Sequence, residues 1–132
     1  MNAEWRWDFA YEILPKMLWA TLNTIMAAGI GYAIAVVVGL IFLIGQRTPY
    51  KVINMIVREI VEFIRSTPLL IQLFFLYFVG PQFGIILSAW VTAMITIGLH
   101  FGTYLSEVYR GALEGVPKSQ WEACRALNFK PT

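Results

Sequence analysis

The sequence predicts an all-α membrane protein with three transmembrane helices and a short helix after the third. Hydrophobic residues make up 58% of the 132 residues and charged residues only 14%, whereas about a quarter of the residues in a soluble domain are charged. Residues 17–46 and 66–106 contain no Asp, Glu, Lys or Arg. Since a helix needs about 20 apolar residues to cross a bilayer core, both runs are long enough to span a membrane.

The first uncharged run predicts span 1 over residues 17–44. It follows residues 1–16, an aromatic segment that we expect at the outer membrane surface, where Trp and Tyr rings are enriched; its aromatic residues include Trp5, Trp7, Phe9 and Tyr11. An apolar leader without a defined place is the alternative for this segment. Residues 45–59 are expected to form a loop.

The second uncharged run is about twice as long as one crossing requires. Gly80–Pro81 divides it, because proline cannot continue a helix without the loss of a backbone hydrogen bond. We therefore predict span 2 over residues 60–79 and span 3 over residues 84–105, joined by a very short turn. Pro68, inside span 2, predicts a bend in that helix.

Span 2 reaches bilayer length only if it includes Glu62 and Arg65. These two residues are spaced to pair at i, i+3, and Arg58 is spaced to pair with Glu62 at i, i+4. Near an interface such pairs are tolerated, since long side chains reach the headgroups. We therefore predict structural roles for Arg65 and Pro68.

Lysine and arginine are distributed unequally along the chain. The turn around Gly80 has neither, the N-terminal segment has two, and eight lie in the first loop with the start of span 2 and in the tail, namely Arg47, Lys51, Arg58, Arg65, Arg110, Lys118, Arg125 and Lys130. Because positive residues concentrate on the cytoplasmic side, the loop 45–59 and the tail 106–132 are predicted to be cytoplasmic and the N-terminus outside. The net charge of +2 is too small to indicate a nucleic-acid partner.

Span 3 carries a polar stripe. At about 100° per residue, six residues share an arc of roughly 80°: Thr92, Thr96, His100, Thr103, Glu107 and Arg110. Beside this arc lie the small residues Gly98, Gly102 and Ser106, and span 1 has a matching small-residue stripe in Thr24, Ala28, Gly31, Ala35 and Gly39. Since small residues let helices approach closely in lipid, we expect these faces to pack on other helices.

Two interpretations of the polar stripe stay open. In one it lines a substrate pathway, with the candidates His100, Thr103, Tyr104 and Glu107. In the other it forms contacts between helices, with threonine hydroxyls bonded to backbone carbonyls, and this is favoured for the threonines. Neither is favoured for His100, because ionisable groups inside membranes are usually functional. Glu107 and Arg110 are expected to pair with each other rather than to contact a substrate.

The tail predicts a short helix after Pro117. Ser119 and Glu122 form the Ser-x-x-Glu pattern of a capping box. Asn128 tolerates the left-handed conformation that ends many helices, and Pro131 prevents a restart.

Chemical motifs are few. The single cysteine, Cys124, excludes an internal disulfide and is interpreted as a reduced bystander thiol. The sequence has no phosphate-binding loop, metal-ligand cluster or nucleophile elbow. No catalytic residue, metal or cofactor is therefore expected, and any ATP would be hydrolysed by another chain.

Three segments resemble permease subunits of ATP-binding-cassette importers, in particular the polar-amino-acid family. Residues 106–131 resemble the cytoplasmic coupling loop, with Glu122-Ala123-x-x-Ala126-Leu127 at the Glu-Ala-Ala signature. Residues 62–73 resemble the Arg-Gly-Thr-Pro-Leu-Leu region, with Ser66 in place of glycine, and residues 104–111 also follow the family. Asn128 replaces the usual glycine after Ala-Leu. Together with Leu99-His100, it resembles the ectoine/hydroxyectoine subgroup.

The resemblance implies a five-span type I importer fold, of which this chain resembles the N-terminal part. It implies a second permease subunit (a homo- or heterodimer), a cytoplasmic ATPase, an extracytoplasmic solute-binding protein and a place in the bacterial cytoplasmic membrane. It also assigns the ATPase-contacting positions of the coupling helix, which are Gln120, Trp121, Glu122, Ala123, Ala126, Leu127 and Asn128. Without the two further spans of the family, the chain is expected not to close a pathway by itself.

The leading hypothesis is therefore a permease subunit that imports a small polar, amino-acid-like solute by alternating access. The alternative is a small three-span scaffold or regulatory protein without transport activity. Co-purification of an ATPase and a partner permease favours the first, and self-association alone favours the second. A membrane enzyme is disfavoured, because a lone His and Glu lack a second acid, a nucleophile or a metal set.

Overall fold

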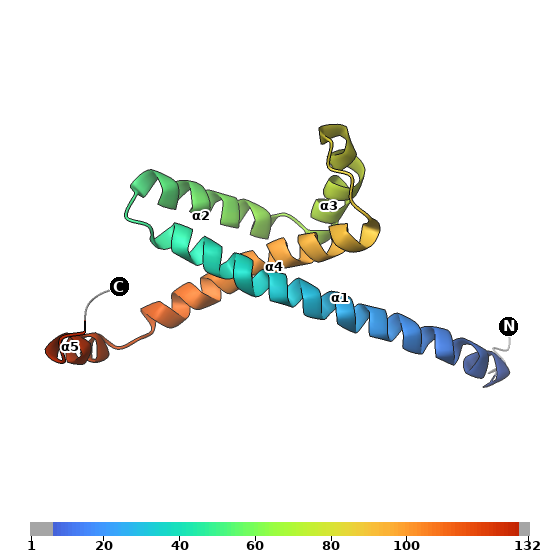
Figure 1. Ribbon diagram of the computed structural model, residues 1–132, viewed down its shortest axis with the longest axis horizontal. Helices are drawn as coiled ribbons and strands as arrows, with labels where there is room; N and C mark the ends of the chain where they lie inside the picture. Colours follow the sequence, from blue (N-terminus) through green and yellow to red (C-terminus); the bar gives the residue numbers. More distant parts are fainter. Residues whose placement is uncertain (1–6, 130–132) are drawn as a thin grey trace.

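The computed structural model describes residues 7–129, and every regular element in this range is a helix. The elements in chain order are α1 (Trp7–Arg47), α2 (Lys51–Ser66), α3 (Leu69–Phe74), the π-helical turn η1 (Phe75–Val79), the 3₁₀ turn η2 (Gly80–Phe83), α4 (Ala89–Glu114) and α5 (Lys118–Ala126). Figure 1 shows α1 and α4 crossing each other, α2 returning beside the end of α1, and α5 set apart from the other helices.

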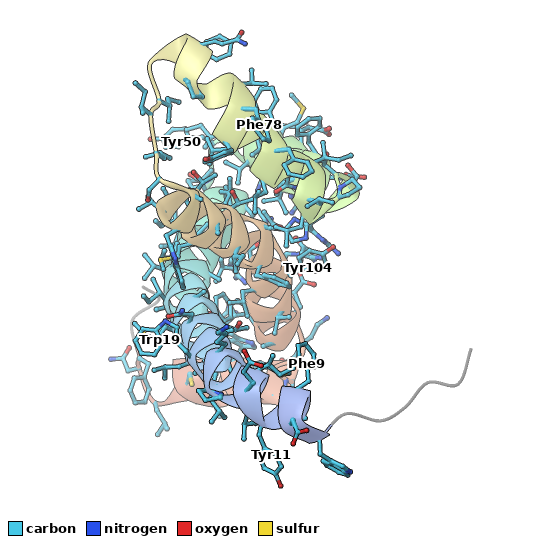
Figure 2. All side chains as sticks on the ribbon, turned by 90° about the vertical axis from the view of Figure 1, so that its right-hand side faces the viewer. Phe9, Tyr11, Trp19, Tyr50, Phe78 and Tyr104 are labelled. Carbon is cyan, nitrogen blue, oxygen red and sulfur yellow. The ribbon has the colours of Figure 1, made fainter. Side chains whose placement is uncertain are left out.

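The first helix, α1, is longer than one membrane crossing. Its 41 residues correspond to about 60 Å at 1.5 Å per residue, twice the thickness of a hydrocarbon core. The helix contains all of the predicted span 17–44 and begins earlier, at Trp7, so the aromatic segment is helical from there on; Trp5 lies outside the described residues. The exposed side chains of Phe9, Tyr11 and Trp19 project from this N-terminal half (Figure 2).

The core is the crossing of α1 and α4, and it is built from small residues. Ala35 of α1 and Thr103 and Ser106 of α4 are completely buried. A Cβ built on Gly102 would lie 2.6 Å from Val38 Cγ1, and one on Gly31 would lie 2.6 Å from Ile97 Cγ2. The small-residue stripes of the two helices therefore lie against each other at Gly31, Ala35 and Gly39, where their backbones approach too closely for larger side chains. Thr24 and Ala28 of the predicted stripe are exposed instead.

Large apolar side chains, by contrast, lie mostly on the outside. Leu43 and Val61 are buried, but Ile44, Phe63 and Phe83 are each at least 70% exposed. Among the described helices, α1 alone is by itself long and apolar enough to cross a membrane; the pair formed by residues 51–66 and 69–83 meets the same criterion together, although it is bent by 102°. An apolar exterior over a small-residue core is the arrangement expected in lipid.

The bend between α2 and α3 is the one that Pro68 predicts. α2 ends at Ser66, Thr67 is extended, and α3 begins at Leu69. Proline has no N–H with which to continue the hydrogen-bond ladder, so the helix breaks at this point. The helix before the break begins at Lys51 and not at residue 60, because the turn that follows α1 is only three residues long.

The turn around Gly80 forms where Gly80–Pro81 predicts it. Gly84 ends it with a φ of 81°, a left-handed conformation that glycine adopts without steric cost. Residues 85–88 are not helical, and α4 begins at Ala89 after Ser88, whose side chain accepts a hydrogen bond from Val91 N at 3.4 Å. The third helix thus begins later than residue 84 and continues beyond residue 105, to Glu114.

The start of α5 differs from the predicted capping box. Pro117 is the N-cap residue, no side chain caps the helix, and Gln120 N donates to Pro117 O at 3.0 Å. Because Pro117 already supplies the extended residue and the first acceptor, the helix begins at Lys118 and places Ser119 inside it. The prediction of a Ser119–Glu122 capping box was therefore wrong.

The C-terminal end of α5 has the left-handed residue, Asn128, that the sequence predicts. Asn128 has a φ of 62°. Phe129 N donates to Cys124 O and Asn128 N donates to Arg125 O, both at 3.0 Å. This pair of bonds is the Schellman motif with asparagine in the left-handed position.

Candidate functional site

The candidate site is centred on Glu107 of α4, whose carboxylate joins three helices. Gln46 at the end of α1 donates from Nε2 to Glu107 Oε1 at 3.1 Å. Arg110 donates from Nη2 to Glu107 Oε2 at 2.6 Å. Arg65 of α2 places Nη1 4.0 Å from the same oxygen. Residues far apart in the chain thus converge on one carboxylate.

Arg110 connects this carboxylate to the end of α4. Its Nη1 donates to both carboxylate oxygens of Glu114 at 3.0 Å. The expected pair of Glu107 and Arg110 is formed. The Arg110 hydrogen bond is the main reason that the pKa of Glu107 lies below its usual value, against an opposing effect of partial burial. Glu107 lies beyond residue 105, the predicted end of the span, and is held as a carboxylate.

Arg65 lies over the aromatic ring of Tyr104, with its guanidinium carbon 4.9 Å from the ring centroid. This distance is within the range of a cation–π interaction. Figure 2 shows Tyr104 on the side of α4. Arg65 therefore contacts α4. The ion pairs of Glu62 with Arg58 and Arg65 that the spacing predicts are not formed in the described part of the chain. Spacing on one helix did not reveal that α4 offers Arg65 a carboxylate and a ring.

A polar cavity of about 460 Å³ opens beside this cluster. Nine residues of α1, α2 and α4 line it: Gln46, Arg58, Val61, Glu62, Arg65, Ser66, Tyr104, Glu107 and Arg110. Gln46 is only 2% exposed, and its Oε1 has no hydrogen-bond partner among residues 7–129. An unpaired buried acceptor is costly.

Gln46 is itself held in place by α2. Asn54 donates from its side-chain amide to the backbone carbonyl of Gln46. One glutamine therefore connects the end of α1 to α2 through its backbone and to α4 through its side chain.

A second cavity, of about 370 Å³, lies between α2, α3, η1 and α4 and is mostly apolar. Thr67, Gln72, Thr96 and Leu99 are among the residues that line it. At its edge Gln72 Nε2 lies 3.1 Å from His100 Nδ1. His100 is 8% exposed and faces this glutamine.

The hydroxyl groups of the polar stripe bond to carbonyls of their own helix. Thr96 donates to Thr92 O at 2.7 Å, Thr103 to His100 O at 2.6 Å, and Ser106 to Thr103 O at 2.7 Å. Their hydroxyls are thereby satisfied within α4.

The four pathway candidates separate in the structure. Tyr104 and Glu107 line the polar cavity, His100 contacts Gln72, and Thr103 is buried without lining either of these two cavities. The predicted ATPase-contacting positions lie on or just after α5, where every residue from 117 to 129 is exposed. α5 packs against no other described helix.

Gln46 and Gln72 were not predicted as site residues. Each is an uncharged polar residue near the edge of an apolar run, and polar residues within such runs frequently mark functional positions. That signal was present for both, but it does not identify a partner.

Comparison with known proteins places these features in a family. The chain is 42% identical, over 125 residues, to a probable amino-acid ABC transporter permease protein of Sinorhizobium fredii, with 93% of this chain and 53% of that protein covered. It is 29% identical over 118 residues to the L-cystine transport system permease protein of Bacillus subtilis, with 86% and 50% covered.

A solved structure is also similar. It is described as the crystal structure of an amino acid ABC transporter with histidines. It matches with a TM-score of 0.73 and 27% identity over 89% of this chain and 58% of the solved chain. This chain thus spans about half the length of the curated relatives it matches.

The family match covers most of the chain, because residues 35–132 correspond to the family of binding-protein-dependent transport system inner membrane components. The matched segment contains the last part of α1, from Ala35 to Arg47, and all of α2 to α5, and thus every residue of the candidate site. The chain therefore belongs to this family of inner-membrane transport components.

Proposed function

We propose that the chain is a permease subunit of an ATP-driven importer for a small polar, amino-acid-like solute. The observation that carries this proposal is the continuity of α4, a single helix from Ala89 to Glu114. Tyr104, Glu107 and Arg110 on this helix line the polar cavity, and only residues 115–117 separate its end from the exposed helix α5. A movement of α5 is therefore transmitted along α4 to the residues that line the cavity.

The cavity has the size and chemistry for such a solute. Its volume of about 460 Å³ lies within the range of about 300–1,000 Å³ of small-molecule sites. Arg58 and Arg65 supply charges for a carboxylate, and the Glu62 carboxylate accepts hydrogen bonds from an ammonium group. The amino-acid and L-cystine transport named for the relatives supports this class of solute, and ectoine-type solutes belong among the compounds to test.

The proposed partners follow from the surfaces that the chain leaves open. Trp121 of α5, and Leu127 and Phe129 just after this helix, are each exposed by at least 51%, and a separate ATPase is the proposed partner for this helix. A second permease subunit and an extracytoplasmic solute-binding protein complete the importer. The Lys and Arg distribution supports a cytoplasmic α5 and an outer N-terminus.

Reversing the charge of Glu122 tests the docking role of α5. We expect Glu122→Lys to reduce co-purification of the ATPase in mild detergent, because the exposed carboxylate on α5 is replaced by a cation, while membrane insertion is retained. Glu12→Lys, an exposed glutamate at the other end of the chain, is the matched control and should retain the ATPase. Unchanged ATPase recovery with Glu122→Lys would refute the docking role, and self-association without any ATPase in the unmodified sample would favour a scaffold protein.

A further inference from the structure

The break between α2 and α3 releases backbone carbonyls that the helix ladder no longer satisfies. In a continuous helix Ile64 O would accept from residue 68, but Pro68 has no N–H. Thr67 O would accept from Ile71 N, but this N–H donates to Pro68 O at 3.0 Å instead. Ile64 O and Thr67 O are thus left without their usual helical donors at the break, apart from a long contact of 3.3 Å from Thr67 N to Ile64 O. Unpaired carbonyls in an apolar environment are costly.

Gln72 satisfies both carbonyls with one amide. Its Nε2 lies 2.7 Å from Ile64 O and 2.9 Å from Thr67 O. Because carbonyl oxygens only accept hydrogen bonds, the nitrogen of the Gln72 amide must face them and its oxygen must point elsewhere. The amide thus connects the last turn of α2 to the first turn of α3.

The same nitrogen faces His100 on α4, with 3.1 Å to Nδ1. The amide nitrogen has two hydrogens for three nearby acceptors, so one hydrogen is shared, and His100 Nδ1 can only be an acceptor, with the ring proton on Nε2. The imidazole is only 8% exposed, and its ring lies 5.3 Å from the ring of Tyr104 and 5.4 Å from that of Phe101. α4 therefore holds a fixed acceptor against the break.

We propose that Gln72 is a positioning residue that fixes the angle between α2 and α3, and that His100 orients its amide. Ser66, before the break, lines the polar cavity, whereas Thr67 and Gln72 line the apolar one. The contacts of the Gln72 amide therefore hold a segment whose residues line both cavities and attach it to α4. This role goes beyond the proposed transport function and does not depend on the identity of the solute.

Distance measurement between two spin labels tests the proposal in lipid nanodiscs without a transport assay. Labels at the exposed positions Met55 of α2 and Phe78 of η1 lie on the two sides of the break, and a Cys124→Ala background removes the native thiol. We expect a narrow distance distribution for the unmodified site. Gln72→Met, which keeps the length but removes both donors, should broaden the distribution and move its mean. Gln82→Met, at an exposed glutamine of η2, is the matched control.

Two variants of His100 distinguish the loss of the hydrogen bond from the loss of side-chain volume. His100→Asn places an oxygen near the Nδ1 position, whereas His100→Leu places a methyl group there. We expect His100→Asn to keep the spin-label distance distribution of the unmodified site and His100→Leu to broaden it. The proposal would be overturned if Gln72→Met left the distance distribution unchanged, or if His100→Asn and His100→Leu broadened it equally. The His100 pair tests it even when Gln72→Met fails to insert as a folded protein.

Discussion

Gln46 at the end of α1 donates a hydrogen bond across 3.1 Å to Glu107 on α4, although 61 positions separate the two residues in the chain. The bond joins the long first helix to the helix that leads to α5. Because Glu107 also accepts hydrogen bonds from Arg110, a change at either residue affects the same cluster.

Replacing Gln46 should destabilise the cluster around Glu107. A substitution that adds a negative charge should destabilise it more than one that only removes the hydrogen bond. Gln46→Met removes a hydrogen bond to a charged group and should lower the free energy of unfolding by about 1–3 kcal/mol. Gln46→Glu should lower it further, because a second carboxylate is placed beside Glu107. Thermal unfolding in detergent, followed by tryptophan fluorescence, measures both changes. Gln82→Met, at an exposed glutamine, is the control. Equal stability of Gln46→Glu and the unmodified chain would contradict the geometry.

The pH dependence of stability should identify the Glu107 carboxylate. Its pKa is lowered in the folded chain, mainly by the Arg110 hydrogen bond, from an ordinary value of about 4.3. A lowered pKa contributes stability that is fully present above the ordinary value and is lost as the pH falls through the folded value. The melting temperature of the unmodified chain should therefore exceed that of Glu107→Gln at neutral pH, and the difference should narrow as the pH falls below the ordinary value of about 4.3. A difference that stays constant from neutral to acidic pH would contradict this prediction.

The α1–α4 crossing should reject even one added methyl group. A Cβ on Gly102 would lie 2.6 Å from Val38 Cγ1 and 2.9 Å from Val38 Cβ, so Gly102→Ala should destabilise the chain by about 1–3 kcal/mol. Gly29→Ala and Gly111→Ala are the controls, because nothing lies within 4 Å of the added atom, and their higher helix propensity should stabilise the chain by up to about 1 kcal/mol. Thermal unfolding in detergent compares the three variants. Similar melting temperatures for all three would show that the crossing is not close.

The end of α5 should depend on the left-handed conformation of Asn128. With a φ of 62°, Asn128→Ala should cost about 1–2 kcal/mol at this helix end, whereas Asn128→Gly should be neutral or stabilising. Hydrogen exchange of the Asn128 and Phe129 amides, which bond to Arg125 O and Cys124 O, reports the change locally. Faster exchange with glycine than with alanine would contradict the assignment.

Local chemistry explains which features could be predicted from the sequence. Pro68 cannot continue a helix ladder, Gly80–Pro81 disrupts one, and Asn128 adopts a left-handed conformation readily, so each acts without reference to the rest of the fold. The small-residue faces of α1 and α4 were also predictable, because helical periodicity places Gly98 and Gly102 on one face. Ser119 was misassigned because Pro117, two residues earlier, is itself sufficient to start the helix.

The candidate site was harder to predict, because its contacts join distant parts of the chain. Gln72 and His100 are separated by 28 positions, and no spacing rule on one helix connects them. Arg65 followed the same pattern, since its expected partner was on its own helix and its observed contacts are on α4. Gln72 and His100 were visible as polar exceptions in an apolar run, but only the packing of the helices assigns their partners.

The accessibility of Cys124 on α5 tests the central claim that this helix meets an ATPase in the cytoplasm. The thiol is exposed, and it is the single cysteine of the chain. A membrane-impermeant maleimide should leave it unlabelled in intact cells, label it in inside-out vesicles, and react more slowly when the ATPase subunit is present. Phe9→Cys in a Cys124→Ala background is the control for the opposite side and should be labelled in intact cells. Labelling of Cys124 in intact cells, or a rate in inside-out vesicles that the ATPase does not change, would contradict the claim.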